Sequence, residues 1–385
     1  MTAFLDADLR QLRAHARAFA ASEIEPLAAQ EDGSDEGARE CLRRLAGSGL
    51  LREVVPAAYD GARPQVSFRA LCVVREELAH AFGLADVLFA MQGLGSYPVT
   101  LAGSEELKRR LLPAVASGRA VAAIAITERE AGSDVAAVAT RARREGESYV
   151  LDGAKTLITN AGIADFYTVL ARTGGEPGAK GLTAFAVEAA TPGVAVTKRI
   201  ETSAPHPIGE IEFRGCRVPS GNRLGKEGEG FKIVMRTLDG FRATVGAAAV
   251  GFARRALEEA IARAKARSQF GRPIAEFEGV QFSLAESAAE LDAARLLVHR
   301  AAARSDLGAE RVTKEAAAAK LFATEAAHRI VDRAVQIHGG LGVVRGAAVE
   351  RLAREVRALR IYEGTSEILK VVLAGRLLEE GLGED

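Results

Sequence analysis

A change in residue periodicity, from helical to strand-like and back, constrains the fold of this 385-residue chain more than any other feature. In the first third, apolar residues recur at the three- and four-residue spacing of amphipathic helices. They include Leu5, Leu9, Leu12, Ala16 and Phe19. From Val121 onward, apolar residues instead form short runs separated by turns rich in Gly, Pro and Asp. The chain therefore predicts a helical segment followed by a β domain.

The predicted β domain contains six short runs. They span residues 121–126, 148–151, 166–171, 182–187, 194–197 and 211–213. Helical spacing returns after the glycine-rich segment 225–230 and continues through long amphipathic segments that predict a four-helix bundle. We therefore expect an α+β multi-domain chain. Its expected parts are an N-terminal α-helical domain at 1–118, a middle β domain at 119–225 and a C-terminal α-helical bundle domain at 226–385.

Length and composition limit the class of protein. The chain exceeds the roughly 250 to 300 residues of one hydrophobic core, so more than one domain is expected. Hydrophobic residues make up 48% of the chain, yet no run approaches the roughly 18 apolar residues of a membrane span. Because 51 basic residues balance 51 acidic ones, the net charge gives no general attraction to nucleic acid.

The cysteines and the first residues bear on cellular location. Cys41, Cys72 and Cys216 are isolated and odd in number, which favours a reducing compartment over a disulfide framework. No basic region followed by an apolar stretch indicates a secretory signal. We therefore expect a cytoplasmic protein. The six histidines have no metal-ligand spacing, so we expect no metal site.

Glu363 is the candidate catalytic base. It lies between Tyr362 and Gly364, just before a final amphipathic segment. A base that removes a proton next to a carbonyl must be held in place, shielded from water and given a pKa near the working pH, and these neighbours suit that task. Taken alone, the segment also fits a helix that Glu363 merely begins, with Thr365 or Ser366 as N-cap.

Five segments, in order, resemble motifs of the acyl-CoA dehydrogenases, a family of flavoproteins. Residues 362–368 resemble its Tyr-Glu-Gly-Thr-Ser-Glu-Ile signature, and residues 127–134 its Thr-Glu-Pro-Gly-Ala-Gly-Ser-Asp loop. The other three segments are residues 153–162, 267–271 and 336–342. They are similar to Gly-x-Lys-x-Trp/Phe-Ile-Thr-Asn-Gly, Arg-x-Gln-Phe-Gly and Gln-x-x-Gly-Gly-x-Gly. The order of helical, β and helical domains is also the architecture that this resemblance implies.

The resemblance implies α,β-dehydrogenation of an acyl thioester, with acyl-CoA becoming trans-2-enoyl-CoA. Glu363 would take the α-proton while its backbone N–H and an FAD hydroxyl hold the thioester oxygen, and N5 of the flavin would accept hydride. In some relatives the base is on another helix, one position before the arginine that matches Arg242. That position is Phe241 here, so the role falls to Glu363 alone.

The resemblance also assigns binding residues. FAD contacts are implied for Ile126, Thr127, Gly132, Ser133, Leu157, Ile158, Thr159, Arg267, Phe270, Gln336, Gly339, Gly340, Thr365 and Glu367. Substrate contacts are implied for Ser133, Asp239, Arg242, Tyr362 and Gly364. Arg267, Phe270 and the 336–340 segment match residues that reach the FAD of a neighbouring subunit, which implies a homotetramer. The electron acceptor implied is an electron-transfer flavoprotein, and the implied role is fatty acid or amino acid catabolism.

Some positions depart from the family pattern. Arg129 and Glu130 replace Pro-Gly, Leu157 replaces an aromatic residue, and Glu278 stands where glutamine is common. Segment 202–207 also differs. Such loops set acyl specificity, so the identity of the substrate stays open. Two alternatives to an acyl-CoA dehydrogenase therefore remain. One is a dehydrogenase for acyl groups carried on an acyl-carrier protein, and the other is a non-catalytic flavin-binding relative.

Overall fold

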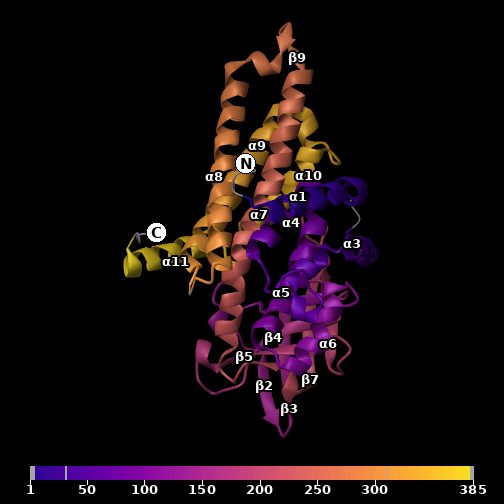
Figure 1. The fold of residues 1–385 in the computed structure, drawn as a ribbon, viewed down its shortest axis with the longest axis vertical. Helices are drawn as coiled ribbons and strands as arrows, with labels where there is room; N and C mark the ends of the chain where they lie inside the picture. The colour runs from indigo at the N-terminus through magenta and orange to yellow at the C-terminus, as the bar shows by residue number, and fades with distance from the viewer. Residues whose placement is uncertain (1–4, 31–32, 310, 382–385) are drawn as a thin grey trace. The chain divides into compact units, whose positions relative to one another are not determined.

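The computed structural model describes residues 5–30, 33–309 and 311–381 (Figure 1). Backbone contacts divide the chain into two compact units. The first, which we call the helical unit, comprises residues 1–30, 68–86 and 239–385. The second, the sheet unit, comprises residues 31–67 and 87–238. We describe each unit by itself.

The helical unit begins with three short helical elements and α4. They are α1 (Ala7–Phe19), the π-helix η2 (Ala20–Ile24), α2 (Glu25–Ala28) and α4 (Phe68–Ala81). It also holds the start of α5 (Gly83–Ala102), most of α7 (Gly230–Ala266) and a hairpin of β9 (Ser268–Gln269) and β10 (Arg272–Pro273). The remaining elements are η8 (Ile274–Glu276), α8 (Glu278–Asp306), α9 (Thr313–His338), η9 (Gly339–Val343), α10 (Ala348–Leu359) and α11 (Ser366–Glu380).

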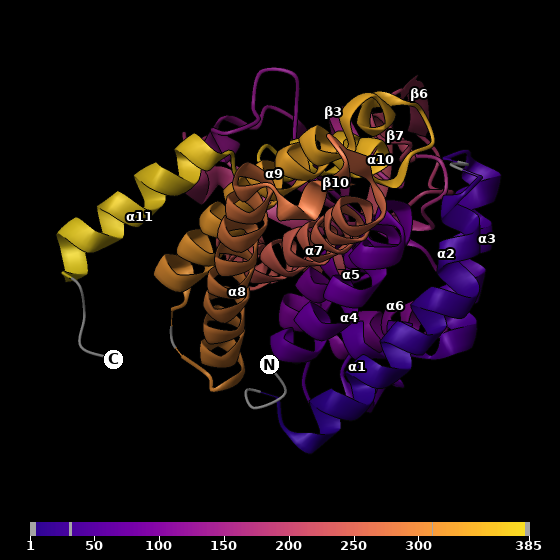
Figure 2. The ribbon, with the colours of Figure 1, turned by 90° about the horizontal axis from the view of Figure 1, so that it is seen from above.

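Small residues let the long helices of this unit approach closely. A Cβ added to Gly246 on α7 would meet Val298 of α8 at 2.7 Å and lie 3.4 Å from Ala323 of α9. Helices α7, α8 and α9 accordingly lie side by side in both ribbon views (Figures 1 and 2). The alanine-rich composition of α9 therefore serves close packing, because alanine adds little bulk between helices.

The sheet unit contains an eight-stranded sheet and the helical elements around it. Its helical elements are α3 (Asp35–Ser48), η3 (Leu50–Val54), η4 (Ala57–Tyr59), most of α5, α6 (Glu105–Ala116), η5 (Val135–Ala137), η6 (Ala179–Gly181) and η7 (Ser220–Asn222). Its strands are β1 (Ala122–Ala125), β2 (Arg141–Glu145), β3 (Ser148–Thr159), β4 (Phe166–Arg172), β5 (Leu182–Glu188), β6 (Val194–Ile200), β7 (Ile208–Pro219) and β8 (Arg223–Leu224). The order is β6-β7-β3-β2-β4-β5-β8, and β1 pairs in parallel with β4.

The six predicted runs correspond to β1, β3, β4, β5, β6 and β7, whereas the two-residue β8 and the longer β2 were not predicted. The sequence of β2, Arg-Ala-Arg-Arg-Glu, has one apolar residue, Ala142, which is buried in the sheet core. Pairing with β3 over the whole of β2 determines this strand, whereas local propensity does not favour it. Helix α5 lies against β1, because a Cβ on Gly95 would come within 2.5 Å of the Ala123 nitrogen.

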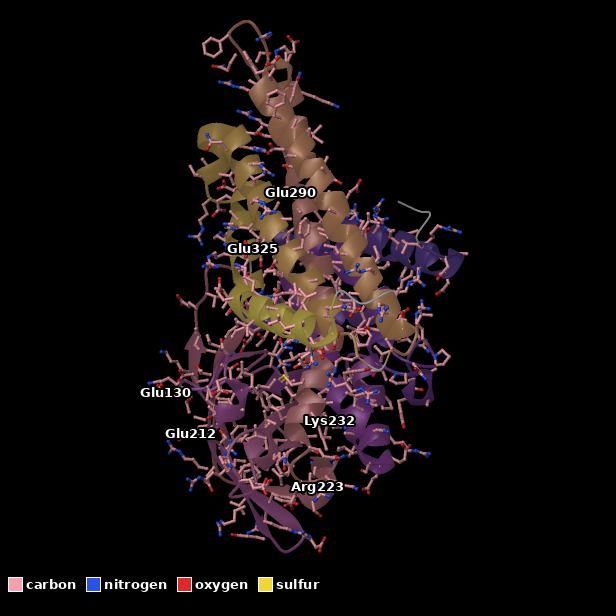
Figure 3. All side chains as sticks on the ribbon, turned by 90° about the vertical axis from the view of Figure 1, so that its left-hand side faces the viewer. Glu130, Glu212, Arg223, Lys232, Glu290 and Glu325 are labelled. Atoms are coloured by element: carbon pink, nitrogen blue, oxygen red, sulfur yellow. The ribbon has the colours of Figure 1, made fainter. Side chains whose placement is uncertain are left out.

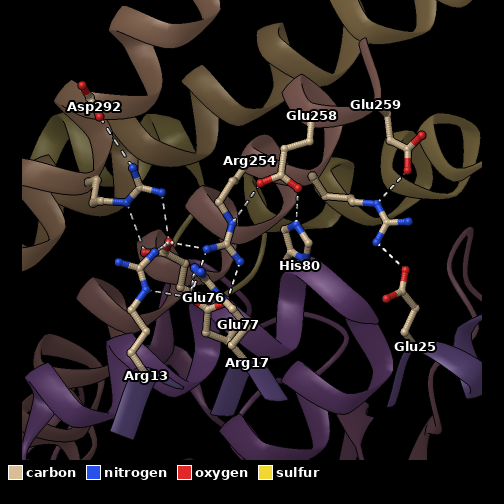
Figure 4. A network of polar contacts seen from close by, with 12 residues as sticks. Arg13, Arg17, Glu25, Glu76, Glu77, His80, Arg254, Glu258, Glu259 and Asp292 are labelled. Atoms are coloured by element: carbon tan, nitrogen blue, oxygen red, sulfur yellow. Dashed lines mark hydrogen bonds and ion pairs between the residues drawn. The ribbon is translucent and has the colours of Figure 1, made fainter. Parts of the chain in front are cut away.

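A buried ion-pair network fixes α4 within the helical unit (Figure 4). Glu77 accepts hydrogen bonds from Arg254 of α7 at 2.7 Å and from Arg13 of α1 at 2.8 Å. Glu76 accepts one from Arg295 of α8 at 2.9 Å. Although burial alone would raise the pKa of both carboxyls, their guanidinium partners lower it. The network therefore holds α4 at a fixed position among three other helices.

The predicted fold class is confirmed. Helices come first, then a β sheet, then the long C-terminal helices. In the part of the chain that the structure describes, no helix is long and apolar enough to cross a membrane.

Candidate active site

Glu363 lies in the turn between α10 and α11, outside both helices. Its backbone φ is +53°, and that of Gly364 is +104°. A left-handed conformation costs a non-glycine residue about 1 kcal/mol or more, so surrounding contacts must hold Glu363. Thr365 is the N-cap of α11, because its hydroxyl accepts a hydrogen bond from the Ile368 N–H at 3.2 Å. Thr365 thus has the capping role that one interpretation gave it, but Glu363 precedes the helix rather than beginning it.

Two cationic side chains hold the backbone of this turn. Arg242 of α7 donates from Nε to the Glu363 carbonyl at 3.2 Å. Lys320 of α9 donates from Nζ to the Gly364 carbonyl at 2.6 Å. Both side chains are buried. Consecutive carbonyls are therefore fixed by charge-assisted hydrogen bonds from two different helices.

A third cation, Arg75 of α4, is only 1% exposed. It forms a bidentate pair with Asp86, with both N···O distances 2.7 Å, and donates to the Thr244 hydroxyl at 2.8 Å. These contacts use three of its nitrogens and fix its orientation. The guanidinium is the strongest of the positive influences on the carboxyl of Glu363.

Glu363 is partly exposed, but one oxygen of its carboxyl is buried without a partner. Its Oε2 is buried and has no hydrogen-bond partner among the described residues. Burial raises the pKa of Glu363, and the charges of Arg75, Lys320 and Arg242 oppose that rise without cancelling it. Burial likewise raises the pKa of the neighbouring Tyr362. A carboxyl with a free acceptor oxygen and a raised pKa has the properties of a general base.

Asp239 orients Arg242. Its Oδ1 accepts from Arg242 at 2.7 Å, and its Oδ2 accepts from the Thr313 hydroxyl at 2.6 Å. Arg242 is only 7% exposed, so this is not an ordinary surface pair. The structure thus joins three of the sequence-predicted residues, Asp239, Arg242 and Glu363, through a chain of hydrogen bonds, and Gly364 is the next residue in the turn.

In the sheet unit the structure brings together the two predicted flavin segments. The Thr127 carbonyl accepts a hydrogen bond from the Thr156 N–H at 2.9 Å, which joins the loop after β1 to β3. Glu128 and Ala131 exchange backbone hydrogen bonds across a tight turn whose tip is Arg129 and Glu130. Glu130, labelled in Figure 3, is exposed at this tip, as is Arg129. The departures from Pro-Gly therefore lie on the surface of the loop.

A buried ion pair sets the shape of this loop. Lys155 of β3 donates to the Ile126 carbonyl at 2.9 Å and to Glu128 at 2.8 Å. The Glu128 carboxylate also accepts the N–H groups of Ala139 at 2.7 Å and Thr140 at 2.9 Å. Burial lowers the pKa of Lys155 to about 8, although Glu128 opposes this shift. The pair ties the loop to β3 and to the segment just before β2.

Leu157 has an unusual conformation next to that loop. Its φ is +56° and its side chain is 56% exposed, at a register irregularity between β3 and β7. An exposed leucine in a left-handed bulge indicates a site where the chain presents apolar surface and backbone groups to a ligand. Of the flanking predicted residues, Ile158 is buried and Thr159 partly exposed, while Gly132 and Ser133 are exposed.

Other predicted cofactor residues lie elsewhere on the helical unit. Arg267 and Phe270 are exposed on the β9–β10 hairpin, and the Phe270 side chain is 93% exposed. Arg242 precedes the end of α7 at Ala266 by 24 residues, which is about 36 Å along the helix. Exposed residues also mark the end of α9 and the start of α11. They are Gln336, Gly339, Gly340 and Glu367.

Two further departures are exposed or lie next to predicted residues. Glu278 is exposed at the first position of α8. In segment 202–207, the Pro207 carbonyl accepts the Asn160 N–H at 2.7 Å, next to Thr159. Among the described residues no group of His, Cys, Asp or Glu could hold a metal ion.

Sequence reasoning missed Lys320, Arg75 and Lys155, although one signal was available. Lys320 falls on the apolar stripe of α9, in line with the buried Ala316 and Ala323. A lone charge on such a stripe indicates a buried polar contact. It also missed Glu325, labelled in Figure 3, which accepts from the Ser366 hydroxyl at 2.6 Å and from Arg360 at 2.8 Å.

The chain matches one family over nearly its whole length. It matches the N-terminal domain of acyl-CoA dehydrogenases at residues 6–119, the middle domain at 123–216 and the C-terminal domain at 228–378. It is 41% identical to the probable acyl-CoA dehydrogenase FadE25 of Mycobacterium tuberculosis, over 96% of this chain and 95% of that protein. It is also 41% identical to the 3-(aryl)acrylate reductase of Clostridium sporogenes, over 96% and 98%. The structure of butyryl-CoA dehydrogenase from Megasphaera elsdenii superposes with a TM-score of 0.92 at 33% identity, covering 97% and 99%.

Proposed function

Since this chain belongs to the acyl-CoA dehydrogenase family of flavin-dependent oxidoreductases, we propose that it removes hydrogen from the α and β carbons of an acyl-CoA thioester. Glu363 takes the α-proton. The observation that carries this proposal is the buried, unpartnered Oε2 of Glu363, in a turn held by Arg242 and Lys320. A carboxylate so placed can accept a proton without first breaking another hydrogen bond.

FAD is the cofactor that the proposal requires. Bound FAD supplies the acceptor for the β-hydride, which no protein side chain can provide. The loop from Ile126 to Ser133 and the bulge from Leu157 to Thr159 would hold its ring system. The left-handed, exposed Leu157 and the ion-paired loop beside it support this role. Tyr362, Gly364, Ser133, Asp239 and Arg242 are the proposed substrate contacts.

We propose that each FAD is shared between subunits of a homotetramer. Within one chain, Arg267 and Phe270 are exposed and lie about 36 Å along α7 from Arg242, a proposed substrate contact, so they are free to reach a cofactor held by a neighbouring subunit. Exposed apolar side chains elsewhere on the helical unit also favour association. They include Phe282, Val343, Val371 and Leu378. Arg267→Ala should therefore reduce FAD retention, and sedimentation should find an oligomer.

The remaining parts of the proposal follow the family. An electron-transfer flavoprotein takes the electrons, and the domain boundaries stay at 1–118, 119–225 and 226–385. The cytoplasm is the proposed location, because Cys41, Cys72 and Cys216 are all free and buried. A second candidate reaction is the reverse one, the reduction of an aryl-substituted acrylate thioester. The similarity to the Clostridium sporogenes reductase favours testing it.

A thioester panel under anaerobic conditions tests the proposal. Bleaching of the oxidised flavin is measured with straight, branched, alicyclic and arylpropionyl thioesters, each offered both as the CoA ester and on an acyl-carrier protein. We expect about one non-covalent FAD per chain and rapid bleaching by at least one CoA ester. Faster bleaching by carrier-bound esters would support the biosynthetic alternative. An absence of bleaching by every thioester, together with no oxidation of the reduced flavin by acrylate thioesters, would support the non-catalytic one.

A further inference from the structure

Lys320 is a buried cation without a carboxylate partner. Its side chain is 0% exposed, on α9. Within the described part of the chain, its ammonium makes one hydrogen bond, the 2.6 Å contact with the Gly364 carbonyl, and no ion pair. Because a buried charge is usually paired, this arrangement needs an explanation.

The position of Lys320 relative to the turn at Gly364 explains why a lysine is buried there. The peptide after Glu363 is held by Arg242 and the next peptide by Lys320. Since φ and ψ of Gly364 lie between these two peptide planes, fixing both planes fixes the local backbone. With the backbone held in this way, the left-handed φ of Glu363 keeps its carboxyl in one direction. Loss of either anchor would let the turn relax towards less strained conformations.

The charges around Lys320 point to a second effect. Glu363 of the turn, Arg242 of α7, Glu325 of α9 and Glu367 of α11 face its ammonium. Arg75, Asp86 and Glu355 also act on the turn. The ionised carboxylate of Glu363 is the group that gains most from a nearby positive charge, because burial otherwise favours its neutral form.

We propose that Lys320 is a positioning residue for Glu363, which fixes the turn at Gly364 and places a positive charge beside that turn. The inference rests on the proposed role of Glu363 as base. It assigns to Lys320 no contact with substrate or with the reacting atoms. It explains why a charge that is expensive to bury stands in an otherwise alanine-rich helix.

Three variants separate this role from general stability. Lys320→Met keeps the length and apolar stem but removes the charge and the donor. Lys320→Arg keeps both. Lys370→Met, at an exposed position on α11, removes the same charge without touching the turn and is the matched control.

The first readout is anaerobic flavin bleaching as a function of pH and thioester concentration. For Lys320→Met we expect kcat to fall by about 10- to 100-fold even at pH values where Glu363 is ionised, because the base is misplaced. FAD content should change less than about twofold, and KM should rise by less than kcat falls, because Gly364 of the same turn is only one of the proposed substrate contacts. Lys320→Arg should recover part of the loss, and Lys370→Met should match the wild type. A wild-type kcat in Lys320→Met would overturn the proposal, as would a KM rise with no fall in kcat.

The second readout does not depend on turnover. The protonated carboxyl of Glu363 is titrated by infrared difference spectroscopy, with Glu363→Gln identifying its band. We expect its pKa to rise by about one unit or more in Lys320→Met, because an opposite charge has been removed. An unchanged pKa would refute the electrostatic part. If this shift occurs while the wild type bleaches with no thioester, the proposed function fails but the link between Lys320 and Glu363 stands.

Discussion

Two buried lysines, one in each unit, provide an instructive comparison. Lys320 in the helical unit and Lys155 in the sheet unit are each no more than 1% exposed, and burial lowers the pKa of each to about 8. Each donates to a carbonyl of a loop that carries predicted site residues, Gly364 in one case and Ile126 in the other. Lys155 is also paired with Glu128 at 2.8 Å, whereas Lys320 has no carboxylate partner in the described chain.

The difference in pairing between the two lysines indicates a different role for each. Around Lys155 the charges cancel, and the Glu128 carboxylate is further satisfied by two backbone N–H groups, so the pair acts as a structural clamp. Around Lys320 the positive charge is not cancelled by a direct partner. The surplus charge is available to Glu363, whose ionised form is otherwise disfavoured by burial. The same residue type thus supports structure in one unit and charge state in the other.

The largest effect is expected from substituting Glu363, which tests whether the turn between α10 and α11 carries the catalytic base. Glu363→Gln preserves size but cannot accept a proton, so turnover should fall by about 10²- to 10⁴-fold while FAD binding survives. Glu379→Gln, which removes a carboxylate at an exposed position on α11, is the control and should behave as the wild type. The measurement is the rate of anaerobic bleaching. Bleaching by Glu363→Gln at the wild-type rate would transfer proton abstraction to another residue.

The next largest effect concerns the paired lysine. Lys155→Met leaves the half-buried Glu128 carboxylate without its cation, so we expect a loss of about 1.5–3 kcal/mol in unfolding free energy and weaker FAD retention. Adding Glu128→Gln removes the unpaired charge and should recover part of the loss. Thermal unfolding and released FAD are measured against Lys180→Met, an exposed control in the same unit. Equal stability of Lys155→Met and this control would show that the clamp is not needed.

The unpaired lysine should give a smaller stability effect with a distinct pH dependence. A pKa lowered from 10.5 to about 8 corresponds to about 3 kcal/mol of charge-burial cost at neutral pH. Loss of the hydrogen bond to Gly364 offsets about 1.5–3 kcal/mol of that cost, so Lys320→Met should change stability little at pH 7.

Proton linkage gives the direction in which the unfolding free energy changes with pH. Because the folded-state pKa of Lys320 lies below its unfolded value, the folded protein binds fewer protons between about pH 8 and 10.5, and wild-type stability gains in that window. Lys320→Met lacks this gain. Its stability relative to the wild type should therefore decrease between pH 7 and pH 10, as measured by denaturant unfolding at both values. A difference that is independent of pH would mean that Lys320 is not buried as a charge.

The smallest effect concerns the N-cap of α11. Thr365→Ala removes the acceptor for the Ile368 N–H and should cost about 1 kcal/mol, whereas Thr365→Ser should cost less. If the Thr365 hydroxyl also contacts FAD, the alanine variant should lose cofactor more than its stability loss explains. FAD retention measured at matched folded fraction distinguishes the two roles.

Much of the fold could be predicted because its signals are local. Apolar spacing located the helices, and apolar runs between turns located six strands. Two strands of the sheet, β8 and β2, were not predicted, and the longer of them, β2, has a single buried residue, Ala142, and is defined by the strand beside it. Local chemistry cannot identify a strand whose stability comes from its neighbours.

The candidate active site also has features that the sequence predicts and features that depend on tertiary packing. The sequence by itself determined the family, the order of the domains and Glu363 as the candidate base, because these depend on residues close together in the chain. Only the tertiary structure brought Arg75 of α4, Arg242 of α7 and Lys320 of α9 around one turn, and only it left Glu363 Oε2 without a partner. Burial and Coulomb interaction depend on distance in space, and helices far apart in sequence set those distances only when they pack.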